Sequence, residues 1–267
     1  MSWSTSYSAK LSIVVDACHR VAARFVLSSL HSQSEESVLD LCKLYAENNI
    51  MHHYIVIERE ILPNLAAAMN LVQKMRAKIA IGNDGVSGTF LSIVCPMAMY
   101  EDIKSHIQFP VDVLYISIPN NHLVVKNADI ADAVLGSIQV NPLIRSIGVT
   151  DLTSVDDIDA FMLTHKHHDK LQFISLHIST LPNLYSMVVE LAHSFGWNCL
   201  LTVEPSVLTQ SHSLPLYTDL AEKYKVPPFV VIFKCVLQLG ALMCFPVQEM
   251  EKIAATFAVD VGESSIH

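Results

Sequence analysis

The sequence predicts an α/β fold of repeated strand–helix units, and three observations support this prediction. Short runs rich in Ile and Val alternate with longer amphipathic stretches along most of the 267-residue chain. The runs are apolar on both faces, as in parallel strands that helices cover on each side. No Pro-, Gly- or Ser-rich linker divides the chain, so we predict a single domain over residues 1–267. A barrel and an open doubly wound sheet both fit this alternation.

The predicted strands are short apolar runs bounded by polar or turn-forming residues. A run over Tyr54–Ile57 is either a further strand or the start of the following helix. The other predicted strands, in chain order, are Leu11–Val15, Ile79–Gly82, Leu91–Cys95, Val113–Ile118, Ile144–Val149, Leu171–Ile178, Cys199–Val203 and Ala241–Phe245.

The predicted helices have apolar residues at three- and four-residue spacing. The first begins at a Ser-Glu-Glu capping sequence, and the third ends before a glycine, as helices commonly do. An apolar stretch over Val226–Val247 is long enough to cross a membrane, but Lys234 and two prolines favour a buried helix and strand. The predicted helices span Ser34–Glu47, Ile61–Met75, Asn183–Phe195, Leu216–Tyr224 and Phe229–Leu239.

Composition narrows the classes of partner. Charged residues make up 16% of the chain and the mean hydropathy is +0.38, which argues against disorder. The net charge of −9 argues against nucleic acid, because phosphate recognition needs clustered Lys and Arg. The six cysteines show no C-x-x-C pair, and residues 1–10 do not resemble a secretory leader. We therefore expect a cytoplasmic protein with reduced thiols and no membrane span.

Several motifs could carry chemistry, and a simpler structural explanation is favoured for each. The loop Gly82–Gly88 matches neither the dinucleotide nor the Walker motif, which favours a turn. The run His165–Asp169 could bind a metal, but a solvated helix end is favoured. Cys95 could be a thiol nucleophile, although a buried small residue is favoured. The acidic pair Asp156 and Asp157 suits the first turn of a helix. We predict no metal site.

The segment from about Asp112 to Pro246 resembles the aldo-keto reductase family. Asp112–Pro119 resembles that family's D-L-Y-L-I-H-W-P strand, and Ile144–Leu152 resembles its I-x-x-I-G-V-S-N-F strand. Leu200–Pro205 falls where the family has V-x-A-Y-S-P, and Ala241–Pro246 resembles V-x-x-I-P. The order and spacing of these matches imply a (β/α)8 barrel of the TIM type.

The resemblance also implies that the chemistry of the reductases is missing. Ser117 stands where active reductases carry a carbonyl-polarising histidine, and Asp151 where they carry a carboxamide-binding asparagine. Val203 replaces the tyrosine that stacks on nicotinamide, and Cys95 lies near the position of the catalytic lysine. No segment matches the D-x-A-x-x-Y-G of the catalytic tyrosine. Since ketone reduction needs a proton donor whose pKa is lowered by a neighbouring cation, we predict a pseudoenzyme without catalytic or cofactor-binding residues.

Within that superfamily the chain resembles the regulatory (modifier) subunits of glutamate–cysteine ligase. Their Ser-Glu-Glu segment, S-P strand end, G-T-S-D-L segment and L-L-T-x-x-x-P-x-x-L loop correspond to Ser34–Glu36, Ile116–Pro119, Gly148–Leu152 and Leu200–Leu208. The resemblance implies a non-catalytic heterodimer partner of the catalytic subunit in glutathione biosynthesis. Such a subunit raises glutamate affinity and relieves feedback inhibition by glutathione.

Two alternatives remain open. The first is a divergent NADPH-dependent aldo-keto reductase, with the cofactor at Val247–Lys252 and a catalytic tyrosine near Tyr45 or Tyr54. The second is an unrelated α/β binding protein. In the barrel interpretation, the carboxyl ends of the strands form the opening where this fold places its functional residues. The candidate rim or partner-contact residues there are Ser117, Pro119, Asn120, Thr150, Asp151, Glu204 and Pro205.

Overall fold

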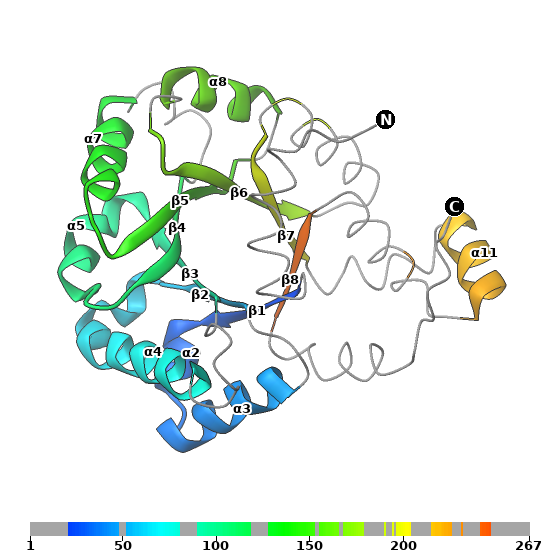
Figure 1. The fold of residues 1–267 in the computed structure, drawn as a ribbon, viewed down its shortest axis with the longest axis horizontal. Helices are drawn as coiled ribbons and strands as arrows, with labels where there is room; N and C mark the ends of the chain where they lie inside the picture. Colours follow the sequence, from blue (N-terminus) through cyan, green and yellow to red (C-terminus); the bar gives the residue numbers. More distant parts are fainter. Residues whose placement is uncertain are drawn as a thin grey trace.

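The strands follow one another in chain order around a closed ring, from β1 to β8, and β8 pairs with β1 (Figure 1). This arrangement is seen in a computed structural model of the chain. The ring confirms the predicted (β/α)8 barrel and excludes the open doubly wound sheet. The structure describes residues 21–47, 52–80, 90–118, 128–152, 155–165, 168–178, 190, 194, 196–203, 215–225, 231 and 241–246.

All neighbouring strands of the ring are parallel. Parallel strands require a crossover between them, and helices lie between most neighbouring strands in the described part of the chain. The strands are β1 (Val21–Val26), β2 (His52–Val56), β3 (Phe90–Pro96), β4 (Val111–Ser117), β5 (Ile144–Thr150), β6 (Leu171–Ile178), β7 (Asn198–Val203) and β8 (Leu242–Pro246).

Helices lie around the outside of the strands, most clearly α4, α5, α7 and α8 (Figure 1). Within the described part of the chain, no helix combines the length and apolar character needed to cross a membrane. The α-helices are α2 (Leu27–His31), α3 (Glu35–Glu47), α4 (Leu65–Ala80), α5 (Tyr100–Ile103), α7 (Ala128–Gln139), α8 (Val155–His165) and α11 (Pro215–Tyr224). Short 3-10 helices η1 (Arg59–Asn64), η2 (Met97–Met99) and η3 (Lys104–His106) connect some of these elements.

Most predicted elements within the described residues are confirmed, with ends shifted by a few residues. The prediction of a strand over Ile79–Gly82 is wrong, because residues 79 and 80 form the end of α4. The sequence spacing of Val72, Met75 and Ile79 is helical, and it continues the pattern of the predicted helix beyond Met75. β1 was not predicted, β2 resolves the undecided segment, and Leu11–Val15 lies outside the described residues.

Alternate residues of each strand divide the core into an outer and an inner part. On β4, Leu114 and Ile116 belong to the outer core beneath the helices, whereas Val113 and Tyr115 belong to the inner core. Each fully buried side chain of this size contributes about 1.5–3 kcal/mol of transfer free energy. Gly148 of β5 makes the inner packing possible, because a Cβ there would overlap the ring of Tyr115.

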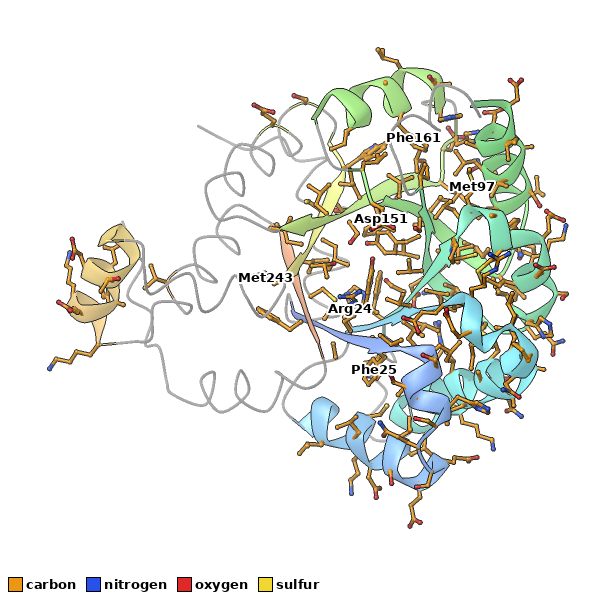
Figure 2. The ribbon with its side chains drawn as sticks, turned by 180° about the vertical axis from the view of Figure 1, so that it is seen from behind. Arg24, Phe25, Met97, Asp151, Phe161 and Met243 are labelled. Carbon is orange, nitrogen blue, oxygen red and sulfur yellow. The ribbon has the colours of Figure 1, made fainter. Side chains whose placement is uncertain are left out.

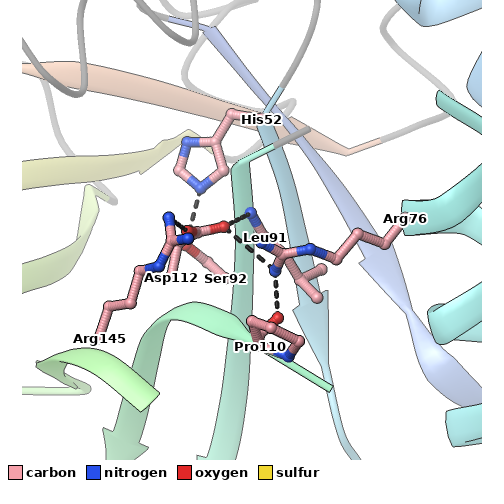
Figure 3. Close-up of polar contacts among 7 residues, drawn as sticks. All are labelled: His52, Arg76, Leu91, Ser92, Pro110, Asp112 and Arg145. Atoms are coloured by element: carbon pink, nitrogen blue, oxygen red, sulfur yellow. Dashed lines mark hydrogen bonds and ion pairs between the residues drawn. The ribbon is translucent and has the colours of Figure 1, made fainter. Parts of the chain in front are cut away.

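Asp112 at the start of β4 joins several elements through one buried carboxylate (Figure 3). Its Oδ2 accepts a hydrogen bond of 2.9 Å from the Leu91 amide of β3, and its Oδ1 accepts one of 2.8 Å from Arg145 of β5. Arg76 of α4 forms an ion pair of 3.3 Å with the same carboxylate and donates to the Pro110 carbonyl. The cluster therefore ties three neighbouring strands to the helix outside them.

Candidate functional site

Three of the candidate rim residues lie together at the carboxyl ends of β4 and β5. The strand register places Ser117 beside Thr150, and Thr150 beside Ser175 of β6. Ser117 Oγ donates a hydrogen bond to the Asp151 carboxylate across the rim. The remaining candidates Pro119, Asn120, Glu204 and Pro205 lie outside the described residues.

Asp151 leaves β5 in a left-handed backbone conformation, with a φ of 69°. Aspartate tolerates this conformation better than most residues with a side chain. Its side chain is half-buried, and Figure 2 shows it within the ring of strands. The turn after β5 thus holds a carboxylate at the opening, where Ser117 fixes its direction.

Hydroxyl groups continue from the rim into the barrel. Tyr54 Oη of β2 donates to Ser175 Oγ at 3.0 Å, and Ser175 Oγ lies 3.3 Å from Thr202 Oγ1 of β7. All three side chains are buried. The pKa of Tyr54 is raised, chiefly by burial, so its phenol holds its proton more firmly than a phenol in water.

The functional signal of this hydroxyl chain is visible in the sequence only in part. Tyr54 was predicted as a candidate tyrosine for the reductase alternative, whereas Ser175 and Thr202 were not among the predicted residues. Both are hydroxyl residues with apolar neighbours on either side in their strands, and that pattern is the signal that could have found them. Their contacts depend on strand register. Tyr45, the other candidate tyrosine, lies on α3, and its side chain is outside the described residues.

Two adjacent histidines occupy β2 and are both buried. His52 Nε2 lies 2.8 Å from Ser92 Oγ, and the rings of His53 and Phe25 meet edge to face at 5.2 Å. Burial lowers the pKa of His52 to about 3, with a smaller effect of His53, and burial lowers the pKa of His53 to about 4. Both imidazoles are therefore neutral at pH 7, and they pack against residues of the neighbouring strands β1 and β3.

The structure agrees with the interpretation of Cys95 as a buried small residue. Cys95 belongs to the outer core, and burial raises the pKa of its thiol to about 12. A nucleophilic cysteine requires a thiolate at working pH, and this environment disfavours one. None of the eight strands carries a lysine; the cations that the described strands carry are Arg24 of β1 and Arg145 of β5.

The prediction of a solvated helix end for His165–Asp169 is wrong for its two described histidines. His165 is 0% exposed and His168 is 7% exposed. Both rings contact Asp132 of α7, a residue more than thirty positions earlier in the chain. The packing of α7 against this connection removes the two side chains from water, which helical spacing alone does not indicate.

At the described rim, Asp151 matches only the hydrogen-bond donor of a nicotinamide carboxamide and not its acceptor. A carboxamide presents both a donor and an acceptor, whereas the Asp151 carboxylate only accepts and already receives the Ser117 hydroxyl. The Val247–Lys252 segment, where the reductase alternative places the cofactor, lies outside the described residues.

Comparisons with known proteins place this geometry in a structural context. No family model matches the sequence, and no curated protein sequence matches it. Among solved structures, MGS-M4, an aldo-keto reductase from a Medee basin deep-sea metagenome library, is 9% identical with a TM-score of 0.62, over 92% of this chain and 87% of that one. The apo form of Gox0644 is 13% identical with a TM-score of 0.60, over 91% and 83% of the two chains.

A third structure, a putative 2,5-diketo-D-gluconic acid reductase B, is 15% identical with a TM-score of 0.58, over 90% and 81% of the two chains. A variant of Gox0644 in complex with NADPH is also similar, at 13% identity and a TM-score of 0.56, over 91% of this chain and 84% of that one. The chain has the barrel fold of the aldo-keto reductases. At these identities the likeness concerns the fold.

Proposed function

We propose that this chain is a non-catalytic regulatory subunit of glutamate–cysteine ligase in the cytoplasm. It binds the catalytic subunit as a heterodimer, raises its affinity for glutamate and relieves feedback inhibition by glutathione. The observation that carries the proposal is the hydrogen bond from Ser117 to Asp151 at the rim. These residues stand where the resemblance places the carbonyl-polarising histidine and the carboxamide-binding asparagine of active reductases.

The chemistry of the barrel interior supports a role in binding. Reduction of a carbonyl needs a proton donor with a pKa brought toward neutrality. Tyr54 is the tyrosine of the described chain of hydroxyls, and burial raises its pKa instead. The Ser117 hydroxyl is held by a carboxylate, and the described strands bring no lysine to either residue.

A regulatory effect of this kind depends on a difference between two states of the partner. Tight binding alone leaves the glutamate affinity unchanged, because only preferential binding to the high-affinity conformation shifts the equilibrium. We propose that the rim around Thr150 and Asp151 contributes to this contact, because the fold gathers its functional residues at the carboxyl ends of the strands.

A coupled ligase assay tests the proposal. The full chain is added to the catalytic subunit from the same organism, and the KM for glutamate and the inhibition by glutathione are measured. We expect a lower KM and weaker inhibition, and Asp151→Gly should reduce both effects whereas Glu101→Gln, at an exposed position of α5, should not. An unchanged KM with no complex in size-exclusion chromatography would contradict the proposal.

The second candidate function is a divergent NADPH-dependent reductase. The observation that favours it is the likeness of the barrel to solved aldo-keto reductases, including one crystallised with NADPH. A fluorescence titration with NADPH, followed by a screen of aldehydes for NADPH oxidation, separates it from the first proposal. Aldehyde-dependent oxidation of NADPH that depends on Tyr54 would establish the reductase and overturn the pseudoenzyme.

A further inference from the structure

Three side chains with metal-ligating atoms meet on the outer side of the barrel, between α7, α8 and the start of β6. Asp132 comes from α7, His165 is the last residue of α8, and His168 lies in the connection to β6. The His168 Nε2 atom lies 2.9 Å from Asp132 Oδ1, and the His165 Nδ1 atom lies 3.3 Å from the same oxygen. All three ligand atoms lie within 4.8 Å of one another.

These separations are close to those around a tetrahedral ion. With metal–ligand bonds of about 2.0–2.1 Å, neighbouring ligand atoms of tetrahedral zinc lie about 3.3 Å apart. The His165–Asp132 separation already has this value, and the His168–Asp132 separation requires a small opening. The two imidazole nitrogens lie within 4.8 Å of each other, so an ion can replace the two hydrogen bonds if these side chains shift to close around it.

The two imidazoles are held in place before any ion binds. The His165 ring packs against Phe161 of α8 at a centroid separation of 4.7 Å. The His168 amide donates to the His165 carbonyl at 3.2 Å, and the Leu171 amide donates to the His168 carbonyl at 2.9 Å. These backbone hydrogen bonds hold His168 close to the end of α8, where His165 lies. Asp132 is 48% exposed and leaves a path from water to the ligand atoms.

The donor set selects a class of ion. Two imidazoles with one carboxylate suit zinc and its neighbours in the transition series, whereas Mg²⁺ and Ca²⁺ prefer oxygen ligands throughout. Three protein ligands with a path to water leave a fourth position for a water molecule. We propose that Asp132, His165 and His168 bind one Zn²⁺-class ion, which fastens α7 to the connection between α8 and β6.

This site lies away from the rim, since the connection enters the amino end of β6, and it does not depend on the proposed function. The test uses the full chain, freed of metal with a chelator and titrated with Zn²⁺ at pH 7.5. Calorimetry should show one equivalent bound, and zinc should raise the Tm. Asp132→Asn should weaken binding at least about tenfold and remove the rise in Tm.

A matched control and a spectroscopic probe separate this site from adventitious binding. Asp129→Asn changes an exposed carboxylate one turn earlier on α7 and should leave the affinity unchanged. Co²⁺ bound at the site should show ligand-field bands of nitrogen and oxygen ligands without a thiolate charge-transfer band, although the chain has six cysteines. His168→Gln should remove these bands.

The asparagine variant keeps the volume of the aspartate side chain, and circular dichroism without metal shows whether it is folded. Equal zinc affinity of the wild type and of folded Asp132→Asn would overturn the proposal. A thiolate spectrum with Co²⁺, or binding of less than one equivalent at a tenfold excess of zinc over protein, would overturn it as well.

Discussion

Ser117 and Asp151 are joined by a hydrogen bond that crosses from the end of β4 to the turn after β5. The hydroxyl is the donor and the carboxylate is the acceptor. A hydrogen bond to a charged group is stronger than one between neutral groups, and this one holds a residue whose backbone φ is positive. The pair therefore determines the conformation of the rim between these two strands.

A double-mutant cycle measures the strength of this contact. Ser117→Ala removes the donor, and Asp151→Gly removes the acceptor while keeping a residue that adopts positive φ freely. We expect a coupling free energy of about 1–2 kcal/mol from chemical denaturation of the four proteins. A coupling near zero would mean that the two side chains do not stabilise each other.

Gly148 should tolerate no side chain, because the Tyr115 ring occupies the place of its Cβ. Gly148→Ala should lower the free energy of unfolding by about 1–3 kcal/mol, as overpacked cores do. Gly136→Ala is the matched control, since a Cβ there meets no atom within 4 Å. In the middle of α7 this control should stabilise the protein by about 0.5–1 kcal/mol. Equal effects of the two substitutions would contradict the inner packing described above.

Asp112→Ala should destabilise the barrel more than removal of an exposed ion pair. The substitution leaves the Leu91 amide without its acceptor and separates Arg76 and Arg145 from their carboxylate. We expect a loss of about 2–4 kcal/mol in urea unfolding. Glu35→Ala, which breaks an exposed pair with Lys74, should cost about 1 kcal/mol or less. A smaller effect at Asp112 than at Glu35 would be inconsistent with the cluster.

The buried histidines of β2 predict a loss of stability in mild acid. The pKa of His52 is about 3 and that of His53 about 4 in the folded chain, against 6.5 for the model value. Below pH 6.5 the unfolded chain binds protons that the native barrel excludes. Stability should therefore fall as the pH drops from about 6.5 toward 4, by up to about 1.4 kcal/mol per pH unit for each histidine.

His53→Leu tests this dependence, because leucine retains an apolar contact with Phe25 of the outer core. The slope of unfolding free energy against pH between 6.5 and 5 should decrease by about 1.4 kcal/mol per pH unit. Gly136→Ala changes no titratable group and is the control, so it should leave this slope unchanged. An unchanged slope in His53→Leu would show that His53 is protonated in the folded chain.

Three cysteines should be unreactive while the protein is folded. Burial raises the pKa of Cys95 and of Cys199 to about 12, and it raises the pKa of Cys244 as well. Thiolates, which are the reactive species, are therefore rare at pH 8. Mass spectrometry after iodoacetamide treatment should find these residues unmodified without denaturant and modified in guanidinium. Labelling of the native protein would contradict their burial, and a disulfide to a partner through them is not expected.

The sequence predicted β5 and β6 closely because apolar residues that favour strands recur along both segments, although polar residues interrupt them. It did not predict β1, where two alanines and Arg24 interrupt the pattern of branched residues. That segment is a strand because β2 and β8 pair with it on either side. Pairing between segments more than two hundred residues apart has no local signal.

The candidate site was likewise predicted in part from the sequence. Ser117, Thr150 and Asp151 were predicted because the resemblance implies a barrel whose opening lies at the carboxyl ends of the strands, where these residues fall. The contact between Tyr54 and Ser175 joins residues 121 positions apart and depends on the register of the whole ring. Asp132 was not linked to His165 and His168 because the packing of α7 against the end of α8 and the connection after it, and not the local sequence, brings these side chains together.

The pairing of β8 with β1 leaves every strand of the ring with a neighbour on both sides. A protein that recognises this barrel therefore cannot add a strand of its own, as partners of open sheets do. Recognition must instead use side chains on the helices and on the loops at the ends of the strands. Affinity for a partner should then be concentrated in a few side chains and should be lost by single substitutions at the surface, with the barrel itself intact.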